Sequence, residues 1–268
     1  MARLRGALRA LWGVSLVLAA AGCGGAPATP TTAVLSDPNE IVTTGIGRLG
    51  AATSLHIDGT INGTINAASL GTISGGSITG LSGSVKLDGS SMSGDVDLAN
   101  RAFHVSASFP RLFATTADIV EVDGFVYTKV SLLGDKYTKS TLPPSLPLAS
   151  SFPLAIALPG KGWASGAQAT LVGREVVDGD DTYHVAMTVP MATLDGALAA
   201  LAGGAAGGLT IDTATLDCWV SVATVQPVKL ELMGSSASLG SLDLTLTLTK
   251  YNQPVTITAP PTGQVQSG

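Results

Sequence analysis

A two-residue alternation of apolar and polar side chains constrains the fold of this chain more than any other feature of its sequence. In the clearest case, residues 242–249, four leucines alternate with one aspartate and three threonines. The same period recurs in residues 55–66, 85–88, 95–98, 103–109, 183–189 and 228–232. Because successive side chains of a strand point to opposite faces of a sheet, the pattern predicts strands with one solvated and one covered face, as in antiparallel sheets.

Short turns separate several of these segments. Residues 87–89, 122–124 and 178–180 contain Asp-Gly and are predicted to close antiparallel hairpins. Roughly nine to eleven strands are expected, and a sheet of that size curls because strand twist accumulates. We therefore predict an α+β, β-dominated fold: a strongly curved antiparallel half-barrel of about 9–11 strands with a few helices on its concave face.

Three segments are candidates to cover that concave face. Residues 38–53 have a strong helix start, with Asp37 as the N-cap and Pro38 at the first helical position. The proline-rich apolar stretch 142–163 and a short helix at 190–202 complete the set. Three modest helices fill a wide half-barrel incompletely, so an apolar cavity is expected. A closed, fully packed β-sandwich is the alternative.

The first 22 residues have the pattern of a secretory leader. Three arginines precede an apolar run at 10–21 that is too short to span a bilayer, and Cys23 follows. The sequence Ala20-Ala21-Gly22-Cys23 resembles the bacterial lipobox, in which the cysteine receives a diacylglyceryl group before cleavage. Ala20 stands where the lipobox usually has leucine. We expect lipidation of Cys23, which would anchor the protein at the outer face of the cytoplasmic membrane or the periplasmic side of the envelope. An ordinary secretory signal cleaved near Ala21 is the alternative.

The remaining chain divides simply. Residues 23–36 are expected to form a flexible tether, 37–260 a single domain, and 261–268 a disordered tail.

The formal net charge is −5, and no Lys/Arg cluster occurs after residue 23, so nucleic acid is excluded as a partner. Cys218 would have no disulfide partner and is expected to be a small buried hydrophobe.

A set of segments occurs in an order typical of one protein family: 37–42, 53–59, 122–129, 173–179, 182–185, 218–230 and 251–257. Together with the lipobox, this order resembles the LppX/LprG-type lipid-binding lipoproteins, which share a LolA/LolB-like half-barrel. Residues 60–82 depart from the family by their Gly, Ser, Thr and Asn content, and 142–166 by their proline content. The resemblance implies a hydrophobic cavity occupied by acyl chains of a lipid or glycolipid. For the carrier function, an envelope transporter or acceptor protein is the expected partner, and its identity stays open.

The apolar strand positions are the candidate lining of such a cavity, with ordinary core packing as the alternative for each. On the strands these are Ile57, Ile61, Phe103, Val105, Tyr183, Val185, Leu244 and Leu246. On the helix side they are Ile46, Leu49, Leu194 and Leu198.

The sequence offers little support for catalysis or for a cofactor. Its three histidines, His56, His104 and His184, lie on the polar side of strand patterns without metal-ligand spacing. A G-x-S-x-G elbow and a phosphate-binding loop are both missing. We therefore predict a non-enzymatic, membrane-anchored lipoprotein that binds a lipid or glycolipid and carries or presents it across the cell envelope. The alternative is a non-catalytic surface β-protein with a solid core that serves adhesion or envelope structure.

Overall fold

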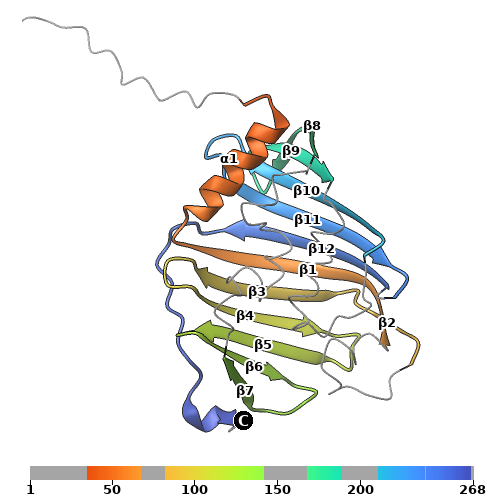
Figure 1. Cartoon of the computed structure of the whole chain (residues 1–268), viewed down its shortest axis with the longest axis vertical. Coiled ribbons are helices and arrows are strands. Elements are labelled where there is room, and N and C mark those ends of the chain that lie inside the picture. The colour runs from red at the N-terminus through yellow and green to blue at the C-terminus, as the bar shows by residue number, and fades with distance from the viewer. Residues whose placement is uncertain (1–34, 68–81, 142–167, 189–210, 239, 267–268) are drawn as a thin grey trace, which may run out of the picture. The chain divides into compact units, whose positions relative to one another are not determined.

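The computed structural model describes residues 35–67, 82–141, 168–188, 211–238 and 240–266. They form one α-helix, one short 3-10 helix and thirteen strands (Figure 1). The elements are α1 (Pro38–Gly50), β1 (Ser54–Asn66), β2 (Ser84–Lys86), β3 (Ser90–Asp97), β4 (Ala102–Phe109), β5 (Thr115–Val122), β6 (Phe125–Val130), β7 (Tyr137–Thr141), β8 (Gln168–Val177), β9 (Asp180–Thr188), β10 (Thr213–Ser221), β11 (Pro227–Ser236), β12 (Gly240–Thr249), η2 (Thr262–Gln264) and β13 (Val265–Gln266).

All thirteen strands belong to one open, curved sheet. Its order is β13-β7-β6-β5-β4-β3-β1-β12-β11-β10-β9-β8, with β2 also paired to β1. Neighbouring strands are antiparallel except β13 and β7. The predicted β-dominated half-barrel is thus confirmed, and the two-layer sandwich is wrong. The strand number exceeds the expected 9–11 because the sheet also contains β2 and β13, which have only three and two residues.

The two faces of this sheet differ in chemistry, as the alternation predicted. One face, here called the apolar face, presents the side chains of Ile57, Val105, Val185, Leu230 and Leu246, which belong to a single hydrophobic cluster. The opposite, polar face presents His56, Asp95 and Ser106 among others. Helix α1 packs on the apolar face over β8 to β11 (Figure 1). A Cβ atom added to its Gly45 would lie 3.4 Å from Val220 Cγ2, so this glycine permits a close approach of helix and sheet.

Helix α1 begins as predicted and ends three residues early. The Asn39 backbone N–H donates to Asp37 Oδ1 at 2.9 Å, which is an N-cap bond. The helix stops at Gly50, and the Ala51 N–H closes its last turn on Gly47 O. Thr53 is already held by the C-terminal segment, because its N–H donates to Asn252 Oδ1 at 2.8 Å. This contact ends the helix before the predicted boundary at 53.

Two of the three predicted hairpins are confirmed. Asp123-Gly124 and Asp178-Gly179 all have positive φ angles and join adjacent antiparallel strands. The hairpin at 87–89 is wrong. β2 and β3 pair with the same edge of β1, so this segment interrupts one continuous pairing. There the Leu87 N–H donates to Gly63 O at 2.9 Å, and Gly63 has a φ of +115° that bends β1.

The predicted disordered tail at 261–268 is also wrong over residues 262–266. Val265 pairs in parallel with Tyr137, and Gln266 Nε2 donates to Thr138 Oγ1 at 2.6 Å. Val265 packs against a second hydrophobic cluster on the polar face, formed by Val120, Tyr127 and Tyr137. This cluster supplies the apolar contact that orders the end of the chain.

Several predictions fall outside the described residues. These are the leader and Cys23, the tether, and the helical segments 142–163 and 190–202. Within the described ranges, no helix has the length and apolar character needed to cross a membrane. Cys218 is free and buried, as predicted, and its burial raises the pKa of the thiol to about 12.

Candidate functional site

The predicted lining residues on strands all lie on the apolar face and are brought together by the strand register. Ile61 is paired with Leu244, while Leu246 is paired with Leu230 on the next strand. Val185 is paired with Cys218. All eight strand candidates are at most 9% exposed and belong to one cluster: Ile57, Ile61, Phe103, Val105, Tyr183, Val185, Leu244 and Leu246.

Two of the four helix-side candidates join the same cluster. Leu49 is buried in it and Ile46 packs against it from α1, half-buried. Leu194 and Leu198 lie outside the described residues. The hydroxyls of Tyr251 and Tyr183 are occupied by backbone groups. Tyr251 Oη donates to Pro227 O at 2.6 Å, and Tyr183 Oη accepts from the Leu35 N–H at 3.0 Å.

One carboxyl group interrupts the apolar face. Glu121 on β5 is paired with Phe103 and with Val126, and only 3% of the residue is exposed. Its Oε2 atom has no hydrogen-bond partner. Burial raises the pKa of Glu121 to about 7, although the charge of Arg101 opposes the shift. The sequence patterns did not point to this residue.

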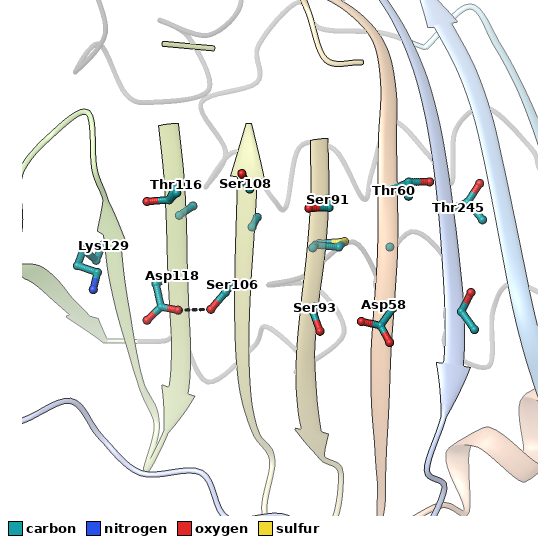
Figure 2. A pocket seen from close by; sticks show the side chains of 15 residues that line it. Asp58, Thr60, Ser91, Ser93, Ser106, Ser108, Thr116, Asp118, Lys129 and Thr245 are labelled. Carbon is teal, nitrogen blue, oxygen red and sulfur yellow. Dashed lines mark hydrogen bonds between the residues drawn. The ribbon is translucent and has the colours of Figure 1, made fainter. Parts of the chain in front are cut away.

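The polar face contains a hollow of about 700 Å³ that spans six strands from β12 to β6. Figure 2 shows its side chains projecting from adjacent strands in two rows across the sheet. The register gives the rows: Thr247-Asp58-Ser93-Ser106-Asp118-Lys129 and Thr245-Thr60-Ser91-Ser108-Thr116. The side chains of both rows carry hydroxyl, carboxylate or ammonium groups, and Met92, Ala107 and Ala117 also line the hollow.

Asp118 is the best connected carboxylate of the hollow. Its Oδ1 accepts from Ser106 Oγ at 2.5 Å (Figure 2) and contacts His104 Nε2 at 3.0 Å. Its Oδ2 accepts from the Tyr137 hydroxyl. Desolvation alone would raise the pKa of Asp118, but the hydrogen bonds from Ser106, Tyr137 and His104 outweigh it and lower the pKa below its usual value.

The other two histidines of the polar face each lie between two carboxylates, which for His184 come from the two neighbouring strands. His184 contacts Glu175 Oε1 at 2.8 Å and Asp217 Oδ1 at 2.7 Å. It stacks on Trp219 at 4.2 Å between ring centroids. Glu175 also accepts from Trp219 Nε1 at 2.9 Å, and this bond, followed by that from His184, lowers the pKa of Glu175. Sequence spacing missed the two partners of His184 because they come from different strands. Among the described residues, no group of three or more His, Cys, Asp and Glu side chains is arranged to hold a metal ion.

A Ser-His-Asp arrangement occurs at the edge of the hollow. Ser93 Oγ lies 3.5 Å from His56 Nε2, and His56 Nδ1 lies 2.6 Å from Asp95 Oδ1. In a serine hydrolase, the nitrogen facing the serine must be free to take its proton. Here Asp58 Oδ2 also lies 3.3 Å from Nε2. A carboxylate therefore faces each ring nitrogen, and Asp58 competes with Ser93 for the Nε2 position.

Comparison with known proteins bears on the fold. No protein-family model and no curated protein matches this sequence. Among solved structures, the lipoprotein LppX of Mycobacterium tuberculosis is similar, with 21% sequence identity and a TM-score of 0.52 over 83% of this chain and 100% of LppX. LprF from Mycobacterium bovis aligns with 17% identity and a TM-score of 0.48 over 83% of this chain and 96% of LprF. At this identity the similarity to LppX shows a shared fold, so the resemblance seen in the sequence segments is confirmed at the level of the fold.

Proposed function

We propose that this protein is a lipid-binding lipoprotein of the LppX/LprG type, anchored through an acylated Cys23. It binds the acyl chains of a lipid or glycolipid on the apolar face of its sheet and carries or presents that lipid across the cell envelope. The observation that supports this proposal best is the continuous apolar face itself, which extends from β4 to β9 in an open sheet. The fold shared with LppX and the order of the family-like segments support it further.

The physical basis of binding would be the burial of methylene groups. Each one removed from water stabilises a complex by about 0.8 kcal/mol, so a long acyl chain needs few specific contacts. The apolar face carries the large hydrophobic cluster, whereas both rows of side chains in the polar hollow end in hydroxyl, carboxylate or ammonium groups. Binding is therefore assigned to the face on which α1 packs.

Lipid extraction tests this function directly. The purified protein would be extracted with organic solvent, the extract analysed by mass spectrometry, and the emptied protein titrated with a fluorescent fatty acyl probe. Stoichiometric lipid or saturable uptake of the probe supports the proposal. A protein that contains no lipid and takes up no probe would contradict it.

A matched pair of variants locates the site. Ile61→Trp places a tryptophan on the apolar face, whereas Thr60→Trp places one on the polar face one residue away. The proposal requires weaker probe binding only in the Ile61 variant. Thermal unfolding of both proteins shows whether a loss of binding comes from a loss of structure.

The anchor needs a separate test because Cys23 lies outside the described residues. Cys23→Ala should move the full-length protein from the membrane fraction to the soluble fraction of the producing cells. Retention in the membrane fraction without acylation would contradict an acyl anchor. An envelope transporter or acceptor protein would then be sought by crosslinking the anchored form.

One observation favours the second function, a surface β-protein with a solid core. Every strand candidate for the lining is at least nine-tenths buried, as in an ordinary packed interior. Such a protein would take up no acyl probe, so the same titration separates the two functions.

A further inference from the structure

The apolar face contains a buried acid whose position is unusual for a hydrophobic core. Glu121 follows Val120 on β5, and its direct partner across β4 is Phe103. Glutamate is rarely fully buried unless it is paired. Here only 3% of the residue is exposed to solvent.

The surrounding protein leaves this acid incompletely satisfied. Its Oε2 atom accepts no hydrogen bond, and Glu121 forms no salt bridge among the described residues. Arg101, the charge that acts on it electrostatically, lies in the exposed turn before β4. Buried polar groups are nearly always hydrogen-bonded in native proteins, so an orphaned buried oxygen requires an explanation. A polar group on a bound ligand provides one.

The location of Glu121 matches the proposed lipid-binding face. Phe103 and Val105 are two of the residues assigned to that face, and Glu121 is the cross-strand partner of the first. Directly paired residues have Cβ atoms about 5 Å apart. A chain lying against Phe103 therefore passes within reach of the Glu121 carboxyl.

We propose that Glu121 is a specificity-determining residue of the lipid-binding face, and that it selects a ligand with a hydroxyl group on its hydrocarbon chain. This inference rests on the proposed function and names the class of lipid. A hydroxyl complements a carboxyl in either protonation state, because it donates to a carboxylate and accepts from a carboxylic acid. An ester or ketone oxygen only accepts, and a ligand carboxylate would be repelled by the ionised form.

The raised pKa of Glu121 agrees with this role. With a pKa of about 7, a large share of the acid is neutral under ordinary conditions. A neutral acid can stay next to hydrocarbon at lower cost than an ion. The site can therefore accept the apolar parts of the ligand together with its hydroxyl.

Competition binding with the full-length protein tests the inference. Stearate and a set of its hydroxylated isomers, with the hydroxyl near the head, middle and end of the chain, would displace a fluorescent acyl probe. We expect at least one isomer to bind about tenfold more tightly than stearate, the effect of one well-placed buried hydrogen bond. Glu121→Leu should abolish that preference and retain stearate binding. Glu121→Gln should keep the preference, because the amide both donates and accepts.

The same substitution on the polar face is the matched control. Glu231 pairs with Lys229 at 3.0 Å, and Glu231→Leu, which matches Glu121→Leu, should leave both affinities unchanged. If stearate binds but no isomer is preferred, or if Glu121→Leu keeps the preference, this inference is wrong and the proposed function stands. If the wild-type protein binds neither the probe nor any competitor, the proposed function fails and this inference fails with it.

Discussion

Glu121 and Phe103 are direct partners across β5 and β4, and a carboxyl group and a phenyl ring are thereby buried side by side at 3% and 2% exposure. Burying a titratable group this way links the stability of the fold to pH. The free energy of unfolding should change most steeply with pH between the ordinary pKa of 4.5 and the raised pKa of about 7. In that interval the folded protein binds more protons at this site than the unfolded chain.

Glu121→Gln should therefore remove a pH-dependent loss of stability. The wild-type free energy of unfolding should fall, relative to the variant, as the pH rises from about 4.5 to about 7, where the contribution of the protonated acid is lost. Between pH 4.5 and pH 8, the wild-type protein should lose about 3 kcal/mol of unfolding free energy relative to the variant. Urea unfolding of both proteins at several pH values measures it. Parallel curves across this interval would contradict a buried acid.

Gly94 should be indispensable to the centre of the sheet. A Cβ atom there would lie 2.2 Å from His104 O and 2.7 Å from Val105 Cα, and backbone atoms cannot move aside cheaply. Gly94→Ala should lower the free energy of unfolding by about 2–4 kcal/mol. Gly173→Ala on β8 is the matched control, since its Cβ would meet no atom within 4 Å and should change stability by less than about 0.5 kcal/mol. Equal effects in chemical denaturation would refute the steric argument.

The alternation in the sequence predicted strand faces well because a period of two leaves little freedom. Tyr183 and Val185 had to share a face opposite His184, and the register confirms it. Long-range pairing could not be predicted in the same way. Thr53 is held by Asn252, 199 residues further along the chain, and no local pattern encodes that contact.

Glu121 escaped sequence reasoning for a physical reason. The segment Ile119-Val120-Glu121-Val122 is apolar on both sides because both faces of β5 are covered at this point. Ile119 packs against the large cluster, whereas Val120 packs with Tyr127 and Tyr137 on the other face. Alternation disappears where neither face is solvated. From the sequence, Glu121 would therefore be predicted to face solvent, although it lies on the apolar face.

Asp118 should stabilise the folded protein at neutral pH and lose this effect in acid, whereas the contribution of Glu121 is lost as the pH rises. Because the pKa of Asp118 is lowered in the folded protein, the unfolded chain binds the proton more tightly at this site. The ionised carboxylate therefore stabilises the folded protein above pH 3.8. This stabilisation is lost as the pH falls through the folded-state pKa. Asp118→Asn should cost about 1–2 kcal/mol at pH 7, because three hydrogen bonds lose their charged acceptor. Acid unfolding curves should converge below pH 3.8. Ser91→Ala, in the neighbouring row of the hollow, is the control and should leave the pH dependence unchanged.

Ser93 should be inert towards reagents that label catalytic serines. Its neighbour His56 is placed between Asp95 and Asp58, with contacts of 2.6 and 3.3 Å, so both ring nitrogens face carboxylates. A fluorophosphonate probe requires a serine whose proton can be taken by a free base. Incubation of the full-length protein with such a probe should give no covalent adduct by intact-protein mass spectrometry, and a known serine hydrolase in the same experiment confirms the reagent. An adduct that disappears in Ser93→Ala would show that this arrangement is catalytic, and would replace the lipid-binding proposal with a hydrolase acting on the polar face.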